Sequence, residues 1–225
     1  MKTEKLILVI LLSFFFTESS IAQDWANLTR YKQENSELKS SGKVKDRIVF
    51  MGNSITEGWS SIRPNFFANN SFVNRGISGQ TTPQMLLRFR QDVINLKPSA
   101  VVILAGINDI AGNTGPMSIE VIAENIFSMA ELARAHNIEV VLCSVLPAAD
   151  FSWRPGLEPA DKVIKLNKLI SRYAKEQNLI YVDYYNSMVN DSKGLKETLG
   201  SDGVHPNARG YEIMESLLET ALLKI

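Results

Sequence analysis

The chain has 225 residues, of which 45% are hydrophobic and 21% are charged, which is an ordinary composition for one globular domain with a well-buried core. Its 24 Lys and Arg residues balance its 24 Asp and Glu residues, so the formal net charge is zero. Nucleic-acid binding depends on clustered cations that neutralise phosphates, so a balanced chain without a basic stripe argues against nucleic acid as a partner.

The first 22 residues have the pattern of a secretory signal peptide. Residues 1–5 carry two lysines, residues 6–16 are apolar except for Ser13, and Ser20 and Ala22 are small residues at the positions that a signal peptidase reads. The apolar run is too short for a membrane span of about 20 residues, so we expect cleavage after Ala22 and no stable membrane anchor. We therefore predict an exported protein, in a bacterial periplasm or outside the cell, with a single domain over residues 23–225.

Apolar runs of strand length alternate with segments of helical spacing along this domain. We expect strands at residues 47–51, 72–74, 100–104, 138–145 and 179–183. We expect helices at residues 24–38, 64–67, 82–96, 118–135 and 160–177, and a last helix that Pro206 starts and that runs to about residue 223. The alternation predicts the α/β class, with a five-stranded parallel sheet between two layers of helices in a three-layer α/β/α sandwich.

The single cysteine, Cys143, excludes an internal disulfide bond. It lies in the apolar run of residues 140–145. In such a strand a free cysteine commonly packs as a small hydrophobic side chain, and we expect that role here.

Three residues that could take part in a reaction follow the first three predicted strands. Ser54 comes after the first strand, Gly76 after the second and Asn108 after the third. The carboxyl ends of parallel strands meet at one edge of a sheet, which is where ligands bind in α/β proteins. Ser54 supplies a hydroxyl nucleophile, and the Ser54 N–H, the Gly76 N–H and the Asn108 amide can serve as oxyanion donors. The alternative is that Ser54 only caps a following helix.

The sequence contains two histidines that could act as the base. His136 falls at the predicted end of a helix, where a histidine commonly interacts with the last carbonyl groups and the helix dipole. His205 follows Asp202 by three residues in a turn with Gly203, a spacing that lets the carboxylate hold one imidazole nitrogen and leaves the other for Ser54. The alternative is that Asp202 and His205 only cap the last helix.

Four blocks of the sequence together resemble a known family. They are Gly52-Asn53-Ser54-Ile55-Thr56, Asn74-Arg75-Gly76-Ile77-Ser78-Gly79, Gly106-Ile107-Asn108-Asp109 and Asp202-Gly203-Val204-His205. In this order they resemble the conserved blocks of the SGNH hydrolases, also called GDSL-type lipases/acylhydrolases. The resemblance implies a flavodoxin-like fold and ester hydrolysis through an acyl-serine intermediate, without a metal or cofactor. One departure is Asn53, where the family often has an aspartate.

The resemblance also implies roles for individual residues. Ser54 would be the nucleophile, His205 the base and then the acid, and Asp202 the residue that orients His205. Ser54, Gly76 and Asn108 would form the oxyanion hole. The substrate would be an ester of a small molecule or a glycan, and short acyl groups on sugars are the expected class. Lysophospholipid or platelet-activating-factor-like acetylhydrolase activity and thioesterase activity are alternatives on the same residues, and a non-catalytic glycan-binding module is a further one.

The irregular segment of residues 146–161 follows the fourth strand, so it is expected to overhang the same edge of the sheet. Phe151, Trp153 and Arg154 lie in it. The two aromatic rings could stack on a sugar or line an acyl slot, and Arg154 could meet an anionic group. The alternative is that the rings only pin the loop down as a local core.

Overall fold

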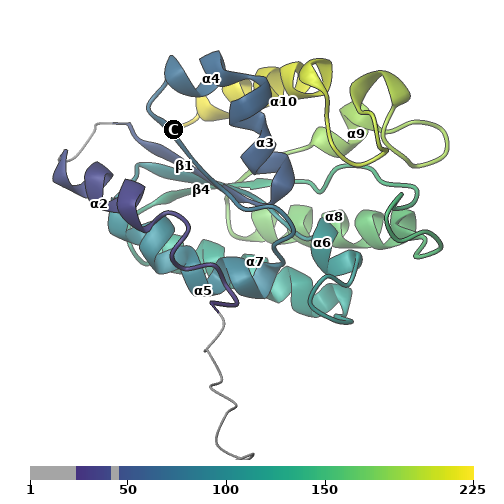
Figure 1. Cartoon of the computed structure of the whole chain (residues 1–225), viewed down its shortest axis with the longest axis horizontal. Helices are drawn as coiled ribbons and strands as arrows, with labels where there is room; N and C mark the ends of the chain where they lie inside the picture. The colour runs from purple at the N-terminus through teal and green to yellow at the C-terminus, as the bar shows by residue number, and fades with distance from the viewer. Residues whose placement is uncertain (1–23, 42–45) are drawn as a thin grey trace, which may run out of the picture.

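The computed structural model describes residues 24–41 and 46–225 (Figure 1), so the predicted signal peptide lies outside the described residues. Its centre is a five-stranded parallel sheet in the order β2-β1-β3-β4-β5. The strands are β1 (Ile48–Gly52), β2 (Phe72–Gly76), β3 (Ala100–Leu104), β4 (Glu139–Cys143) and β5 (Ile180–Val182). This is the flavodoxin-like strand order, and it confirms the predicted fold class.

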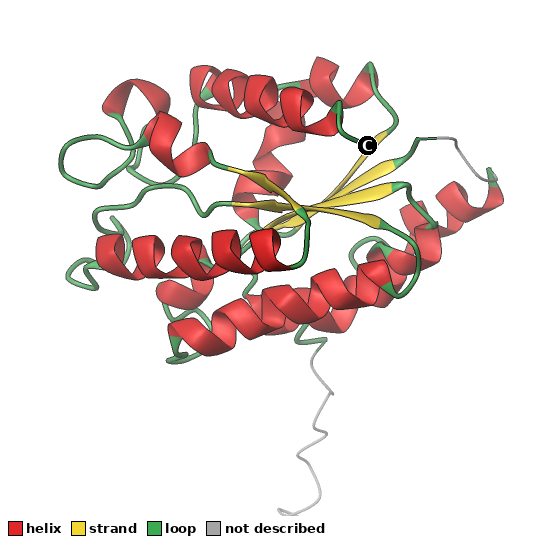
Figure 2. Ribbon diagram, turned by 180° about the vertical axis from the view of Figure 1, so that it is seen from behind, coloured by secondary structure: helices red, strands yellow, loops and turns green. Residues whose placement is uncertain are grey.

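Helices cover both faces of the sheet, as Figure 2 shows from behind. One layer holds α5 (Thr82–Asp92), α7 (Ile119–Arg134) and α8 (Pro159–Glu176), with α2 (Lys32–Ser40) beside η1 (Ile94–Leu96). The other holds α3 (Ser54–Ile62), α4 (Pro64–Ala68), α9 (Tyr184–Met188) and α10 (Ala208–Leu222). The short α6 (Ile107–Ile110) and η2 (Glu197–Leu199) lie in the connections. Every residue of β1 and β3 is buried, because helices cover both sides of the central strands.

The predicted first helix begins later than the sequence pattern suggests. It starts at Lys32 instead of residue 24, because Asn27 has a positive φ of 54° and the Asp24 carboxylate accepts the backbone N–H groups of Leu28 and Thr29 in a turn. The pattern of spaced apolar side chains continues through this turn, so periodicity alone could not locate the boundary.

Two other helix boundaries also differ from the prediction. The helix expected over residues 82–96 ends at Asp92, and a 3₁₀ turn follows it. The last helix starts at Ala208 instead of Pro206, because the Asn207 side chain accepts the Gly210 N–H at 3.1 Å and caps the helix. The alternative in which Asp202 and His205 only cap this helix is therefore wrong.

Cys143 is the last residue of β4 and is buried, as predicted for a structural cysteine. Burial raises the pKa of its thiol to about 12. At neutral pH the group is therefore a thiol and behaves as a small apolar side chain.

An aromatic cluster fixes α3 between the sheet and α10. Trp59 is 1% exposed, stacks on Phe66 and Tyr211 with ring centroids 5.3 Å away in each case, and meets Phe50 of β1 edge-on. The Trp59 indole donates to Glu215 at 3.0 Å, and the Tyr211 hydroxyl donates to the Ile55 carbonyl at 2.7 Å. Buried aromatic rings with satisfied polar groups contribute strongly to stability, so this cluster sets the position of the helix that begins at Ser54.

We expect Trp59→Ala to lower the free energy of unfolding by about 3–5 kcal/mol, because it removes the largest fully buried ring and leaves a cavity. Urea denaturation followed by circular dichroism measures the change. The control is Trp153→Ala, which removes an indole that is 47% exposed and should cost less than about 1 kcal/mol. Equal losses in the two variants would contradict the placement of Trp59 at the centre of the core.

Candidate active site

The hydroxyl of Ser54 stands at the first residue of α3, directly after the carboxyl end of β1. Asn53 is the N-cap of this helix, and its side chain accepts the backbone N–H of Ile55 at 3.0 Å. The alternative that Ser54 only caps the helix is therefore wrong, since its neighbour fills that role. The Ser54 hydroxyl remains available for another partner.

That partner is His205. The Ser54 Oγ lies 2.9 Å from His205 Nε2, and His205 Nδ1 lies 2.6 Å from Asp202 Oδ2. The first of these contacts joins residues 151 positions apart in the sequence. An imidazole that is held at Nδ1 by a carboxylate presents Nε2 to a hydroxyl as a proton acceptor, so this chain of three groups can activate the oxygen of Ser54.

A tight turn holds Asp202 against His205. Gly203 has a φ of 81°, in the left-handed region that favours glycine, and the second carboxylate oxygen of Asp202 accepts the backbone N–H groups of Val204 and His205 at 3.0 and 2.7 Å. Partial burial raises the pKa of Asp202, but these two bonds and the bond from the imidazole outweigh burial and lower the pKa below its usual value. The group therefore stays ionised at neutral pH and keeps its hold on Nδ1.

The sheet register brings the loops of the other predicted residues to the same edge. Gly52 is the register partner of both Gly76 in β2 and Leu104 in β3, so β2, β1 and β3 end at one level. Asn108 lies in α6, four residues after β3, and is 5% exposed. Its side-chain amide donates to the Gln80 carbonyl at 3.0 Å, which leaves a second N–H on the same nitrogen. The Ser54 N–H belongs to the first turn of α3, where backbone N–H groups lack helical acceptors.

The structure gives Gly76 a different task from the predicted oxyanion contact. Its N–H already donates to the Asn74 side chain at 2.8 Å. A Cβ atom at this position would lie 2.1 Å from the Glu57 nitrogen, so a glycine is needed for α3 to pack this closely on β2. The sequence shows the glycine but not which atom of the neighbouring helix requires it.

Gly79 is the residue of this loop whose N–H is available. Its φ is 76°, its carbonyl accepts the Asn113 amide at 3.0 Å, and its N–H makes no hydrogen bond within residues 24–41 and 46–225. It also adjoins Gln80, which binds Asn108. The second glycine of the block was visible in the sequence, but only the hydrogen bonds separate its role from that of Gly76.

The three predicted substrate contacts in the loop of residues 146–158 have three different surroundings in the structure. Phe151 is fully buried beneath Trp153, with ring centroids 5.1 Å apart, so it is a packing residue and not a direct contact for substrate. Trp153 is 47% exposed, and its ring lies 6.1 Å from that of His205. Arg154 donates to the carbonyl groups of Ala111 and Gly112 at 2.6 and 3.2 Å, which ties the loop to the segment after α6.

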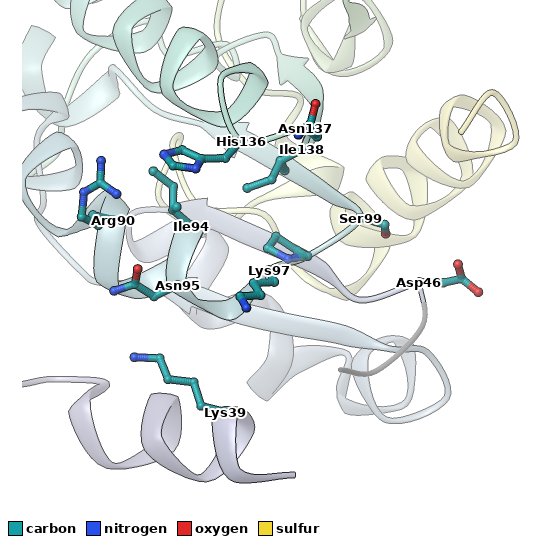
Figure 3. A pocket seen from close by; sticks show the side chains of 11 residues that line it. Lys39, Asp46, Arg90, Ile94, Asn95, Lys97, Ser99, His136, Asn137 and Ile138 are labelled. Atoms are coloured by element: carbon teal, nitrogen blue, oxygen red, sulfur yellow. The ribbon is translucent and has the colours of Figure 1, made fainter. Parts of the chain in front are cut away.

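A cavity of about 330 Å³ opens between this loop and the turn of Asp202. Polar and acidic side chains contribute to its lining, among them Asp150, Ser152, Asn190 and Glu197. A larger cavity of about 930 Å³, drawn in Figure 3, lies at the opposite edge of the sheet, where Ser99 and Ile138 precede β3 and β4. His136 lines that distant cavity just beyond the end of α7. The two histidines therefore lie at opposite ends of the strands, His136 at the amino ends and His205 at the carboxyl ends.

Asp109 is a buried carboxylate of the site that the sequence did not reveal as important. It is 3% exposed, and it accepts the Thr82 N–H at 2.9 Å and the Thr82 hydroxyl at 2.6 Å. These bonds join the residue after Asn108 to the first turn of α5. Burial raises the pKa of Asp109 to about 6, against the lowering effect of the Thr82 bonds.

Known proteins share this sequence pattern and this fold. The GDSL-like Lipase/Acylhydrolase family matches residues 50–213, which is most of the chain. The chain belongs to this family. The membership places it among the carboxylic ester hydrolases. A GDSL-like lipase from Bacteroides thetaiotaomicron VPI-5482, known from a crystal structure, has 51% sequence identity to this chain. Its structure matches with a TM-score of 0.86 over 88% of this chain and 98% of that one.

Two further relatives of this GDSL-family chain match over shorter segments. Esterase TesA of Pseudomonas aeruginosa is 24% identical over 160 residues, which is 69% of this chain and 73% of that protein. The uncharacterized lipoprotein YqeF of Bacillus subtilis (strain 168) is 37% identical over 82 residues, so the match spans about a third of each protein, at 35% and 34%.

The described residues contain neither a cluster of metal ligands nor a membrane-spanning helix. Within residues 24–41 and 46–225, no three or more His, Cys, Asp or Glu side chains come together as metal ligands. In the same part of the chain, none of the helices has the length and apolar character needed to cross a membrane.

We expect the buried Asp109 to make stability depend on pH. Its folded pKa of about 6 exceeds the ordinary value of 3.8, so the folded state holds this proton more tightly. The resulting stabilisation is full below pH 3.8 and is lost as the pH rises through 6. As the pH rises from 3.8 to 6, wild type should therefore lose roughly 3 kcal/mol of unfolding free energy relative to Asp109→Asn.

Urea titrations of both proteins at half-unit steps of pH measure this difference. Asp24→Asn is a matched control, because hydrogen bonds from the Leu28 and Thr29 N–H groups lower the pKa of exposed Asp24. Its contribution has the opposite sign, so it is gained as the pH rises. A difference for Asp109 that does not change with pH would show that this carboxyl is not destabilised by burial.

Proposed function

We propose that the protein is a serine esterase in which Ser54 is the nucleophile, His205 the general base and Asp202 the residue that orients His205. The observation that carries this proposal is the chain of hydrogen bonds from Ser54 Oγ through His205 to Asp202, at 2.9 and 2.6 Å, in a member of a family of ester hydrolases. This is the arrangement in which an imidazole held by a carboxylate activates a serine hydroxyl as a nucleophile.

The proposed mechanism has two balanced halves. His205 Nε2 takes the proton of Ser54 as Oγ bonds to the acyl carbon, and the proton then passes to the leaving alcohol as the ester C–O bond breaks. Water next attacks the acyl-serine, gives a proton to His205, and releases the acid as the proton returns to Ser54 Oγ. Asp202 remains ionised throughout and stabilises the imidazolium that forms in each half.

Three N–H groups are the proposed oxyanion donors. They are the Ser54 N–H, the free N–H of the Asn108 side chain, and the Gly79 N–H in place of that of Gly76, which is already bonded. The negative charge develops on the carbonyl oxygen beside Ser54, and fixed donors at that point lower the barrier because they need no reorganisation.

For the substrate we propose short acyl esters, with an acetyl group on a carbohydrate as the first candidate. The half-exposed face of Trp153 beside His205 offers a stacking surface of the kind that sugar rings use, and the 330 Å³ cavity next to Asp202 has polar walls that can receive hydroxyl groups. The reading of residues 1–22 as a signal peptide supports export, and the likeness to a lipoprotein of Bacillus subtilis supports it further.

We expect Ser54→Ala to abolish turnover of p-nitrophenyl acetate, because the nucleophile is gone. Asn108→Ala should lower kcat by roughly 10²–10³-fold, the usual cost of one oxyanion donor. Ser40→Ala is the matched control, since this exposed α2 hydroxyl donates to the Ser36 carbonyl of its own helix at 2.9 Å and should leave kcat within about twofold. Undiminished turnover in Ser54→Ala would remove the proposal. A fluorophosphonate probe separates the binding-module alternative, because it labels Ser54 only in an assembled site.

We expect Trp153→Ala to lower kcat/KM on an acetylated sugar by roughly tenfold, equivalent to about 1.4 kcal/mol of lost stacking. The loss on ethyl acetate should be smaller, because its alcohol has no ring to stack. A pH-stat assay measures both substrates without a chromophore. Equal losses on both would contradict a sugar platform, and faster turnover of a lysophospholipid or a thioester than of acetylated sugars would favour those alternatives.

A further inference from the structure

Arg88 of α5 is a fully buried arginine that hydrogen-bonds four separate groups. It is 0% exposed. Its Nη2 donates to the carbonyls of Gly52 and Arg75 at 3.0 and 2.8 Å, its Nε donates to the Gln80 side-chain oxygen at 2.5 Å, and its Nη1 donates to Asp92 at 3.0 Å. Burying a guanidinium is costly unless its charge and its donors are matched; here Asp92 faces the charge and four of the five N–H groups have acceptors.

The acceptors of Arg88 belong to the backbone next to the proposed reacting groups. Gly52 is the last residue of β1, two positions before Ser54. Arg75 lies one residue before the end of β2, where the loop that contains Gly79 begins. The planar fork of the guanidinium therefore joins the ends of two neighbouring strands through a single nitrogen, which sets their spacing at this edge of the sheet.

Gln80 extends the same network to the third strand end. Its side-chain oxygen accepts from Arg88, and its side-chain nitrogen donates to the Ala26 carbonyl at 2.7 Å. Its own backbone carbonyl accepts the Asn108 amide at 3.0 Å. Gln80 is 3% exposed, so these bonds are shielded from competing water. The orientation of Asn108 thus depends on a residue whose side chain Arg88 holds.

We propose that Arg88 and Gln80 act as one positioning unit that holds the Ser54 strand end, the Gly79 loop and the Asn108 amide in the alignment needed for turnover. The inference rests on the proposed esterase function, but neither residue touches substrate in it. Misplacement of reacting groups by about 1 Å can cost roughly 10²-fold in rate, so loosening this network should lower kcat even in a protein that remains folded.

The test is Arg88→Lys, which keeps the charge beside Asp92 but loses the fork that reaches both strand carbonyls and Gln80. We expect kcat on p-nitrophenyl acetate to fall roughly 10–100-fold while KM stays within about threefold. The matched control is Arg47→Lys, because Arg47 is a 3% exposed arginine that also donates to a backbone carbonyl, that of Leu96 at 2.8 Å, at the opposite end of β1. It should lose stability but keep kcat within about twofold.

A second variant covers the case in which Arg88→Lys does not fold. Gln80→Met removes the amide that links Arg88 to Ala26 and leaves Arg88, Asp92 and the strand carbonyls intact. We expect a fall in kcat of roughly tenfold. Gln91→Met is its control, since Gln91 lies on α5 with Arg88 and donates to the Leu28 carbonyl of the same N-terminal segment at 2.6 Å, without a hydrogen bond to Arg88 or Asn108. In the double variant the two losses should not multiply, as expected for one network.

The outcomes separate this proposal from the proposed function. Folded Arg88→Lys or Gln80→Met with wild-type kcat overturns the positioning unit, as does an equal fall of kcat in the Arg47→Lys control. If wild type hydrolyses none of the esters, the esterase proposal fails instead. In that case the rate at which a fluorophosphonate labels Ser54 still decides the role of Arg88, because that rate depends on the alignment of Ser54 and its oxyanion donors.

Discussion

The constraint on which the rest of the site depends is the common level at which β1, β2 and β3 end. Gly52 pairs in register with both Gly76 and Leu104, so the three loops that leave these strands begin side by side. The flavodoxin-like strand order places the reversal of strand order between β1 and β3, which is where a crevice opens in this class of fold. Ser54 and Asn108 flank that crevice because the sheet register puts them there. The turn that carries His205 therefore meets a serine whose position the sheet has already set.

Buried polar groups, together with apolar packing, fix the geometry of the site. Arg88 with Asp92 on one side, and Asp109 with Thr82 on the other, bring charge into positions that are almost fully screened from water. Such groups cost free energy to bury, and the raised pKa of Asp109 is a direct sign of that cost. Their directional bonds define a single arrangement of loops, which apolar contacts alone specify less sharply. An ester hydrolase needs that definition, because its donors have to meet the developing charge without rearranging.

The sequence carried much of this information, though not all of it. The apolar runs and their alternation with helices predicted five strands in a parallel sheet, since buried strands leave a strong pattern of hydrophobic residues. The spacing of Asp202 and His205 predicted their contact, because the turn between them is local. Gly76 and Gly79 could not be told apart, since the difference lies in which N–H is already bonded. Arg88 and Gln80 gave no signal, because a buried arginine reads in the sequence like any exposed one on a helix.

The long separation between Ser54 and His205 has a consequence for how the enzyme comes into being. All five strands precede His205 in the sequence, but α10 follows it and supplies Tyr211 and Glu215 to the cluster around Trp59. The closing segment of the chain therefore brings the imidazole to Ser54 and also completes the packing around the helix that carries the serine. Reactivity and the final support of α3 are thus acquired together, when the last turn and α10 join the sheet.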